Sequence, residues 1–249
     1  MPMTVLAHIS DLHIGQRPEN ASRAAAVMDY LNGLPGRVDA IVVTGDIADH
    51  GAADEYAEAA DILRSPYPVL VCPGNHDQRK TFRSRLLGEG EADEPINRIA
   101  ELPGAIIALC DSSVPGRNDG LLSAGTIAWL RRAIADAGEG RPILIAFHHP
   151  PVEVGSPFLD SIRQFGEDRL AAVIADHPAV AGVLCGHGHS SAAATFAGVP
   201  LRMAPGVAST LKLPWEHDGV LDFRLPPGIA FHIIDERGIL TSHYRLVPV

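Results

Sequence analysis

Aromatic residues and cysteines are scarce in this chain of 249 residues. Phe, Trp and Tyr together make up 5% of it, and there are three cysteines. Cys72, Cys110 and Cys185 each end an apolar run, where a small hydrophobic side chain is normally buried. An odd number of cysteines at these spacings fits neither a disulfide framework nor a zinc ribbon. We therefore expect free thiols in a reducing compartment.

Clustered positive charge and long apolar runs are also missing. The chain carries 20 Lys and Arg against 30 Asp and Glu, a formal net charge of −10, with no basic run that would follow a phosphate backbone. No apolar stretch is long enough to span a bilayer, and the first residues do not resemble a secretory leader. These absences argue against a membrane protein and against binding of long nucleic acid. They favour a cytoplasmic protein with a small-molecule substrate.

The residues that are present are typical of a globular α/β protein. Hydrophobic residues make up 46% and charged residues 20% of the chain. No shift in composition marks a linker, so we expect a single domain over residues 1–249. Short β-branched runs alternate with segments of helical periodicity, which indicates largely parallel strands. The expected strands cover residues 4–9, 38–44, 67–72, 105–110, 142–147 and 180–185.

Helices are expected between these strands, and the pattern changes near the C-terminal end. Apolar residues at helical spacing predict helices around 27–34, 127–134 and 170–174, the second after an N-cap at Ser123. Residues 194–204 predict a hairpin, and 228–247 predict two antiparallel strands that turn near Gly238. The sheet architecture is then mixed. Residues 205–228, rich in Pro and Gly, are expected to form a long ordered loop.

Polar residues with metal-binding side chains follow five of the six predicted strands. In an open parallel sheet, the loops beyond the carboxyl ends of the strands lie along one edge, so residues far apart in sequence can converge there. The residues in question are Asp11, His13, Asp46, Asn75, His148, His187 and His189.

These seven side chains offer carboxylate, amide and imidazole donors and no thiolate. Such a set suits Mn, Fe, Co or Zn better than Ca or Mg, which prefer shells made only of oxygen. Seven ligands exceed what one tetrahedral zinc can use. If Asp46 bridges, two ions would lie roughly 3.5–4 Å apart, as in two-metal hydrolytic sites. Glycines at 45, 74, 186 and 188 would allow positive φ and close backbone approach around the ions.

The ordered series of short motifs resembles the calcineurin-like metallophosphoesterases. The series comprises DLH at 11–13, GD at 45–46, GNHD at 74–77, HHPP at 148–151 and GHGH at 186–189. Five motifs in order are far more specific than any one of them. The segment CDSSVPGRNDGLLS at 110–123 looks like the bacterial branch that contains glycerophosphodiesterases and class III cyclic nucleotide phosphodiesterases. This resemblance implies a four-layer α/β/β/α sandwich of two mixed sheets flanked by helices, and it makes a homodimer a fair expectation.

The resemblance also implies roles for individual residues. Asp11, His13, Asp46 and His189 would hold one ion, and Asp46, Asn75, His148 and His187 would hold the other. His76 would be a histidine that binds no metal and acts near the leaving group, as a general acid or as a stabiliser of charge, with Asn75 and His76 contacting substrate. The implied reaction is attack of a metal-activated hydroxide on phosphorus.

Several readings stay open at the level of sequence. The substrate class is small phosphodiesters, either cyclic nucleotides or glycerophosphodiesters. A phosphomonoesterase, a nuclease of the same fold, or a catalytically silent scaffold that binds proteins are the alternatives. A scaffold predicts missing ligands, whereas all seven positions are filled here.

Polar residues beside the motifs have structural explanations as well. Asp77 and His149 could support a ligand or serve packing, whereas Asp49 and His50 are expected to serve the turn or to cap the next helix. Asp111, Ser112 and Ser113 could meet substrate or form a turn. Trp215 and His217 could line the pocket mouth or a subunit contact. His8 is expected in the core, and His232 is expected to be half-exposed.

Overall fold

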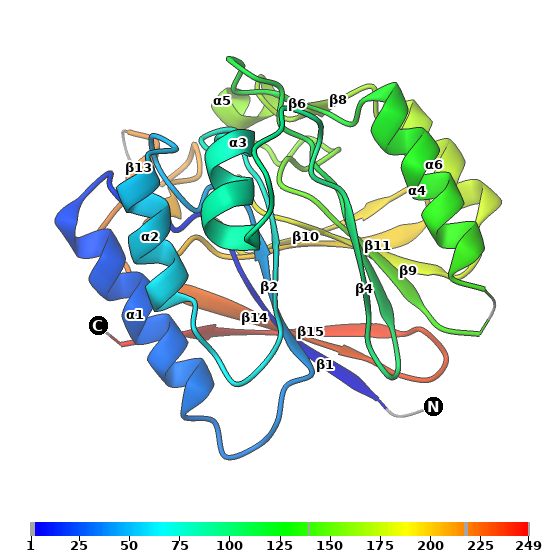
Figure 1. Cartoon of the computed structure of the whole chain (residues 1–249), viewed down its shortest axis with the longest axis horizontal. Coiled ribbons are helices and arrows are strands. Elements are labelled where there is room, and N and C mark those ends of the chain that lie inside the picture. Colours follow the sequence, from blue (N-terminus) through cyan, green and yellow to red (C-terminus); the bar gives the residue numbers. More distant parts are fainter. Residues whose placement is uncertain (1–2, 139, 217–218, 249) are drawn as a thin grey trace.

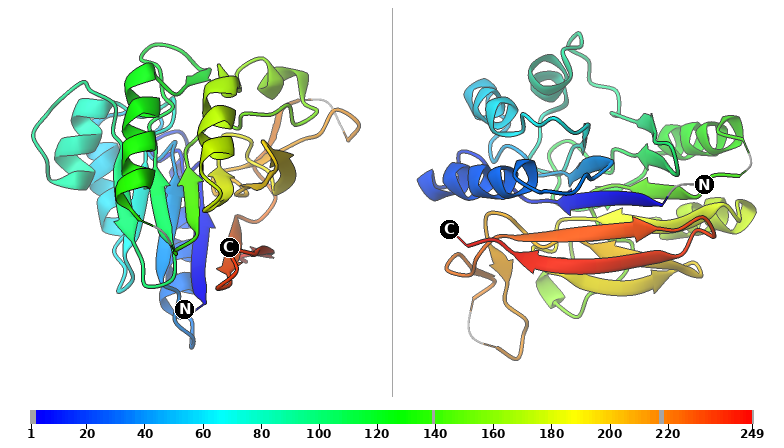
Figure 2. Two further views of the ribbon diagram at one scale, coloured as in Figure 1. Left: turned by 90° about the vertical axis from the view of Figure 1, so that its right-hand side faces the viewer. Right: turned by 90° about the horizontal axis from the view of Figure 1, so that it is seen from below.

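Two large sheets lie face to face, with helices on both outer faces (Figure 1). The computed structural model describes residues 3–138, 140–216 and 219–248. The first sheet has the order β15-β14-β1-β2-β3, with β1, β2 and β3 parallel and β14 and β15 antiparallel to their neighbours. Its strands are β1 (Thr4–Ile9), β2 (Ala40–Thr44), β3 (Val69–Cys72), β14 (Gly228–Ile234) and β15 (Leu240–Leu246). Figure 2 shows β14 and β15 alongside β1.

The second sheet is also mixed, with the order β10-β11-β9-β7-β5-β4. Its four central strands are parallel, and the outer strands β10 and β4 are antiparallel to their neighbours. The strands are β4 (Arg98–Glu101), β5 (Ile106–Leu109), β7 (Ile143–Ala146), β9 (Val180–Cys185), β10 (Ala192–Phe196) and β11 (Val199–Met203). Two small strand pairs accompany the large sheets. β6 (Gly120–Leu121) pairs with β8 (Gln164–Phe165) in parallel, and β12 (Thr210–Leu211) pairs with β13 (Leu221–Asp222) in antiparallel orientation.

Helices complete the four layers. They are α1 (Pro18–Asn32), α2 (Ala53–Ile62), α3 (Arg79–Phe82) with the π-helical turn η1 (Arg83–Leu87), α4 (Ala124–Asp136), α5 (Pro157–Asp160) and α6 (Glu167–Asp176). None of the helices in the described part of the chain is long and apolar enough to cross a bilayer. With helices on the outer face of each of the two sheets, the predicted four-layer α/β/β/α architecture is confirmed.

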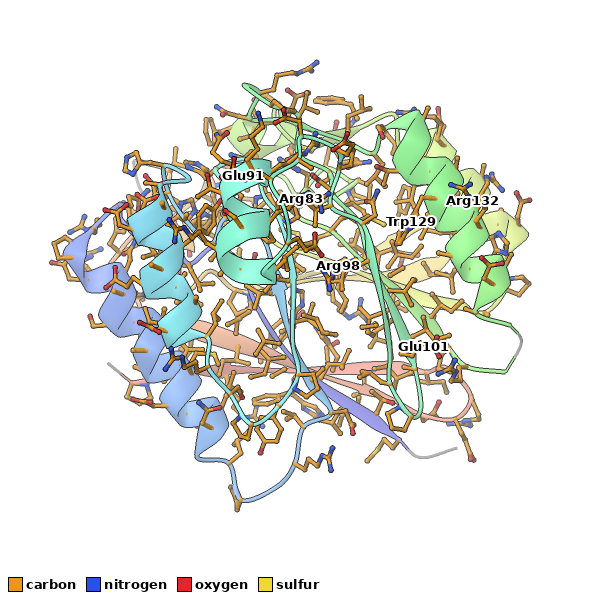
Figure 3. The ribbon with its side chains drawn as sticks, in the orientation of Figure 1. Arg83, Glu91, Arg98, Glu101, Trp129 and Arg132 are labelled. Atoms are coloured by element: carbon orange, nitrogen blue, oxygen red, sulfur yellow. The ribbon has the colours of Figure 1, made fainter. Side chains whose placement is uncertain are left out.

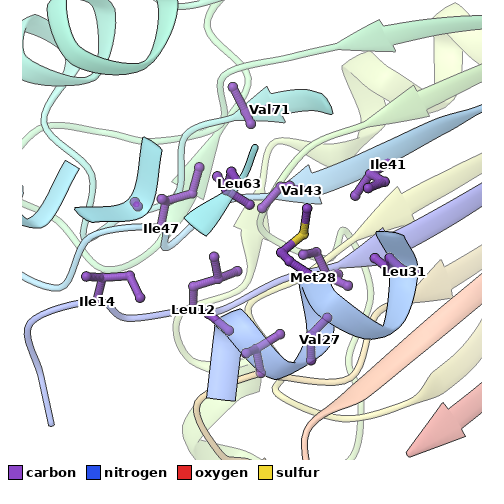
Figure 4. Close-up of a cluster of buried hydrophobic side chains, with 14 of the residues drawn as sticks. Leu12, Ile14, Val27, Met28, Leu31, Ile41, Val43, Ile47, Leu63 and Val71 are labelled. Carbon is purple, nitrogen blue, oxygen red and sulfur yellow. The ribbon is translucent and has the colours of Figure 1, made fainter. Parts of the chain in front are cut away.

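Each outer layer is attached by an apolar face. Proline at the first turn suits the start of α1, because its missing N–H has no helical partner there. From that helix, Val27, Met28 and Leu31 are buried against side chains of the first sheet such as Ile41 and Val43 (Figure 4). On the second sheet, the predicted cap of α4 is confirmed, since the Ser123 hydroxyl accepts the Thr126 N–H at 3.0 Å.

A third apolar layer joins the two sheets. It includes Leu6 and Val42 from the first sheet and Leu144 and Leu184 from the second. His232 also lies in this layer, so the prediction that it is half-exposed is wrong. Its side chain is fully buried between the sheets, because it bonds to another buried histidine rather than to water.

Exposed charges mark the free edge of the second sheet, where β4 pairs only with β5 (Figure 3). The Arg98 guanidinium contacts the Glu89 carboxylate, and Arg141 bonds to Glu101 at 2.7 Å. Charged side chains on an edge strand discourage pairing with another chain.

The six predicted strands, the 194–204 hairpin and the C-terminal antiparallel pair are all confirmed within one or two residues at each end. The prediction of a long ordered loop over 205–228 omits a short hairpin. The segment folds back on itself as β12 and β13, where Leu211 faces Leu221 across the pair.

Candidate metal centre

The loops after β1, β2, β3, β7 and β9 meet at one edge of the sandwich. Residues from β1 and β2 loops of the first sheet contact residues from β7 and β9 loops of the second sheet there. The seven predicted metal-binding residues lie together at this edge, and we call them the seven-residue cluster: Asp11, His13, Asp46, Asn75, His148, His187 and His189.

One half of the cluster is formed by Asp11, His13 and His189, whose ligand atoms are close enough to share an ion. The His13 and His189 Nε2 atoms are 3.2 Å apart, and His189 Nε2 is 3.4 Å from Asp11 Oδ1. Ligand atoms at about 2.0–2.1 Å from a tetrahedral metal are roughly 3.3 Å from one another. The spacing therefore fits the edges of a coordination shell.

The other half is formed around His148 and His187. Their nearest ring nitrogens, His148 Nε2 and His187 Nδ1, are 3.1 Å apart. His148 Nε2 is also 3.2 Å from Asp46 Oδ2, and the same oxygen is 3.6 Å from His13 Nε2. One carboxylate oxygen of Asp46 thus faces ligand atoms from both halves.

Three atoms of the cluster are buried without any hydrogen-bond partner: Asp11 Oδ2, Asn75 Oδ1 and His187 Nε2. Burying such atoms unpaired costs about 1–3 kcal/mol each. They are half of the six such side-chain atoms in the described residues, and the other three belong to Arg83 and Gln164. Donor chemistry and lack of partners together fit these atoms to a bound cation.

Hydrogen bonds to the far side of three imidazoles direct the near side inward. The Nδ1 atoms of His13, His148 and His189 lie 2.8, 2.6 and 2.8 Å from Asp49 Oδ1, Thr44 O and Ser209 Oγ, respectively. Such partners orient a ligand histidine and raise its basicity. The prediction that Asp49 serves the turn or caps the next helix is wrong for its side chain, which bonds to His13. The role of Ser209 carries no signal in the sequence.

His76 lies at the rim of the cluster. Its ring Nδ1 is 2.8 Å from the Asp49 carbonyl oxygen, and its backbone N–H donates to Asp46 Oδ1 at 3.0 Å. The side chain is 37% exposed and lines the same cavity as the cluster. With Nδ1 anchored to a carbonyl, Nε2 is left to face a bound molecule.

The backbone of the cluster is strained. Six non-glycine residues in the described part of the chain have positive φ, and five of them belong to the cluster: Asp11, His13, Asp46, His187 and His189. Left-handed backbone at such residues costs about 1–3 kcal/mol each and gathers at functional sites. The strain therefore points to the cluster independently of its side-chain chemistry.

The glycines beside the cluster act mainly through their lack of a side chain. Gly45 has a positive φ, of 86°, as predicted, but Gly74, Gly186 and Gly188 do not have a positive φ. A Cβ at Gly74 would lie 2.2 Å from Asp46 Oδ1, and one at Gly186 would lie 1.9 Å from the Ser10 hydroxyl. Gly74 therefore lets the loop after β3 approach the loop after β2 within the first sheet, and Gly186 lets the end of β9 approach the ends of β1 and β2 from the other sheet.

Burial and neighbouring charges separate the protonation of the imidazoles. Burial lowers the pKa of His148, but the Asp46 carboxylate outweighs it and raises that pKa to about 9. Burial also lowers the pKa of His187 and of His189, which favours their neutral, metal-binding form.

Asp77 and His149 are fully used within the protein. The Asp77 carboxylate accepts N–H groups from Ile47, Ala48 and Gly74 and the Tyr56 hydroxyl. Burial and the nearby Asp46 raise its pKa to about 6.

The two ring nitrogens of His149 lie within hydrogen-bond distance of Ser112 Oγ and the Asn118 carbonyl. Asp111 bonds to Arg79 at 2.8 Å and to the Ser113 N–H, also at 2.8 Å. The polar groups after β5 thus have hydrogen-bond partners within the protein. Trp215 is 75% exposed and is not among the residues that line the cavity, and His217 lies outside the described residues.

Comparison with known proteins identifies the family to which this arrangement belongs. The sequence pattern of the calcineurin-like phosphoesterases matches residues 4–191. A probable cyclic nucleotide phosphodiesterase of Rhodococcus erythropolis is 35% identical over 229 residues, which cover 88% of this chain and 75% of that protein. A glycerophosphodiester phosphodiesterase, GpdQ, of Enterobacter lignolyticus is 32% identical over 243 residues, which cover 92% and 86%.

A solved structure shares the fold. The dimetal phosphatase from Danio rerio aligns over 100% of both chains with a TM-score of 0.69 at 14% identity. The likeness extends through both sheets and the helices that flank them. By sequence pattern and by relatives, this chain belongs to the calcineurin-like phosphoesterase family, and these relatives are named as phosphodiesterases.

Proposed function

We propose that this protein hydrolyses small phosphodiesters, either cyclic nucleotides or glycerophosphodiesters, with two divalent transition-metal ions in the seven-residue cluster. The observation that carries this proposal is that three side-chain atoms of one cluster, Asp11 Oδ2, Asn75 Oδ1 and His187 Nε2, are buried without a hydrogen-bond partner. Relatives named for both substrate classes support it. The donors are oxygen and nitrogen only, which favours Mn, Fe, Co or Zn.

Asp46 is the proposed bridge between the two ions. Its Oδ2 atom faces His13 on one side and His148 on the other, at 3.6 and 3.2 Å. We assign the ligands by half of the cluster. Asp11, His13, Asp46 and His189 hold one ion, and Asp46, Asn75, His148 and His187 hold the other.

Bound ions would polarise the phosphoryl oxygens and supply an activated water at neutral pH. The chain itself supplies the other groups that the reaction needs. His76, held through Nδ1, presents Nε2 to the departing alcohol and gives it a proton. Asn75 and His76 line the cavity beside the cluster and contact the phosphoryl group.

The test removes the bridge. Asp46→Ala should lose bound metal and lose hydrolysis of cyclic AMP, glycerophosphoethanolamine and bis(4-nitrophenyl) phosphate by at least about a hundredfold, because both ions share this ligand. Metal content is measured by mass spectrometry after dialysis. The matched control is Asp61→Ala, which removes an exposed carboxylate on α2 that pairs only with Arg64 at 2.7 Å.

Full metal occupancy with unchanged turnover in Asp46→Ala would contradict the bridging role. A wild-type protein that is loaded with Mn and hydrolyses none of the diesters would contradict the function. The same panel, extended with 4-nitrophenyl phosphate, separates a diesterase from a monoesterase by the ratio of specificity constants.

We also propose a cytoplasmic location and allow for a homodimer. The three cysteines are buried free thiols, which supports a reducing compartment.

A further inference from the structure

The cavity beside the metal cluster has one polar side and one apolar side. The polar side is the rim of the cluster itself, with His13, Asp46, Asn75, His76, His187 and His189. The apolar side, which we call the outer wall, comes from two segments that face the cavity together. Its members are Phe158 and Leu159 of α5, Ile162 just after it, and Leu211, Val220 and Leu221 of the β12–β13 hairpin.

The α5 half of the wall is fixed from below. The Asp160 carboxylate accepts the Val154 N–H at 2.7 Å, which closes the turn that carries the helix. Leu159 is 5% exposed, and its Cδ1 atom lies 3.8 Å from where a Cβ on Gly188 would be, between the two histidines of the β9 loop. Phe158, its neighbour, is 53% exposed at the cavity. A buried leucine thus holds an exposed phenylalanine in place.

The hairpin half is attached to the cluster directly. The Leu211 N–H donates to the His189 carbonyl at 3.1 Å, so β12 is hydrogen-bonded to the backbone of a predicted metal ligand. The Lys212 N–H then donates to the Val220 carbonyl at 2.8 Å, which brings β13 back along β12. Leu211 is buried, whereas Val220 is 39% exposed. This half also pairs a buried anchor with an exposed apolar tip.

Beyond the cluster and His76, the described residues that line this cavity carry no charge. The polar members there are Gln16 and Asn118, and the rest are apolar or glycine. An ammonium or a polyhydroxyl group would find no carboxylate on this wall. Exposed apolar side chains gathered at a cavity commonly mark a ligand contact, and aromatic rings stack on flat partners.

The cavity is also small. Its volume is about 180 Å³, against roughly 300 Å³ at the lower end for pockets that hold drug-sized ligands. With a phosphoryl group beside the cluster, a substituent as large as a nucleoside would extend across the exposed tips of Phe158 and Val220.

We propose that Phe158 and Val220 determine specificity by contacting a flat aromatic or heteroaromatic group on the substrate, and so favour aryl and nucleoside esters over glycerol-type esters. This inference rests on the proposed function, since it places the phosphoryl group at the cluster. The two residues take no part in the reaction at phosphorus.

The test measures binding without turnover. Phenylphosphonate and methylphosphonate carry the same charged head and differ in one substituent, and each is titrated calorimetrically into the protein loaded with Mn. In the wild-type protein, phenylphosphonate should bind about tenfold more tightly, in line with what apolar contacts supply in selectivity. In Phe158→Ala the preference should fall to about twofold, and Val220→Ser should lower it in the same direction.

The matched control is Phe165→Ala, which removes another exposed phenylalanine that lies outside the cavity and packs on Arg163. This variant should keep the tenfold preference. Equal affinities for the two phosphonates in the wild-type protein, or an unchanged preference in Phe158→Ala, would overturn the proposal. Because phosphonates are not hydrolysed, this outcome is distinct from a failure of diester hydrolysis, which would refute the proposed function instead.

Discussion

Asp49 connects two histidines of the site through two different groups. Its carboxylate bonds to Nδ1 of His13, and its backbone carbonyl bonds to Nδ1 of His76, both at 2.8 Å. The first histidine is a proposed ligand and the second a proposed acid. A single residue in the loop that follows β2 therefore positions one group that would hold metal and one that would move a proton.

Replacing the Asp49 carboxylate separates these two contacts. Asp49→Ala removes the bond to His13 and a longer contact of 3.5 Å with His76 Nδ1, and it keeps the carbonyl that lies 2.8 Å from the same nitrogen. We expect affinity for Mn to fall about 10–100-fold, as is typical when a partner of a ligand histidine is lost. Calorimetric titration of the metal-free protein measures this, with Asp61→Ala as the control. Wild-type affinity in Asp49→Ala would show that His13 needs no such partner.

His76 should affect protonation of the leaving group and leave metal binding intact. In His76→Ala we expect wild-type metal content, with turnover of an alkyl ester falling about 100-fold or more and that of a 4-nitrophenyl ester far less. The difference arises because an alkoxide needs a proton to depart and a nitrophenolate does not. Steady-state rates for both esters, with metal analysis of the same samples, test this. Equal losses for the two esters would remove the acid role.

At the scale of elements, the strands that run through the buried layers are predictable, whereas the short strands β4, β12 and β13 are not. The segment Ile143–Ala146 is apolar throughout and buried, so its pattern alone indicates a central strand. β4, with the sequence RIAE, has exposed charges at both ends because it is an edge. The two-residue strands β12 and β13 are too short for any periodicity, and only their pairing defines them.

The site follows the same division. Placement of Asp11, Asp46 and His187 at strand ends is visible in sequence, since strands of one sheet deliver their loops to one edge. The left-handed backbone of these residues has no sequence signal, because aspartate and histidine are ordinary residues elsewhere. Contacts from distant segments, such as Ser209 to His189, depend on tertiary packing and were not predictable.

Gly186 tests how closely the ends of the elements must approach. An added Cβ would lie 2.7 Å from the Thr44 carbonyl, which also accepts the Nδ1–H of His148. Gly186→Ala should therefore push β9 away from the end of β2, destabilise the protein by about 1–3 kcal/mol and weaken metal binding. Urea unfolding and metal titration measure these effects.

The control for this substitution is Gly125→Ala, in the first turn of α4. A Cβ there would make only an ordinary contact, 3.6 Å from the Ser123 hydroxyl. We expect wild-type stability or a slight gain, since alanine favours a helix. If both variants behaved alike, steric crowding at Gly186 would be refuted.

At the scale of the whole molecule, two histidines lie in the layer between the sheets. His8 Nδ1 is 3.0 Å from His232 Nε2, and both residues are fully buried. Burial, with the positive charge of Arg202 nearby, lowers the pKa of His232 to about 3. The contact between the sheets thus requires this imidazole to stay neutral.

Acid should weaken the docked sheets through this group. In the unfolded chain His232 takes up a proton below a pH of about 6.5, while in the folded protein it stays neutral down to about pH 3. Its contribution to stability is complete above pH 6.5 and is lost as the pH falls. Between pH 6.5 and 5 the loss is about 2 kcal/mol.

His232→Gln cannot titrate, so its free energy of unfolding should depend less on pH by about that amount. Urea unfolding at pH 7 and pH 5 measures the difference. His243→Gln, on the exposed face of the neighbouring strand β15, should keep the wild-type dependence. An unchanged dependence in His232→Gln would place the acid sensitivity elsewhere.

The metal cluster draws its residues from both sheets, and this bears on how the chain reaches its working state. Asp11, His13 and Asp46 belong to loops of the first sheet, whereas His148 and His189 belong to loops of the second. His13 and His189 are separated by 176 positions in the chain, and closing so long a loop is slow because its entropy must be lost before the contact forms. The cluster therefore needs both sheets in place, and we expect it to form late in folding. Metal uptake during refolding should then report the docking of the two sheets, and neither half of the chain carries a complete set of ligands alone.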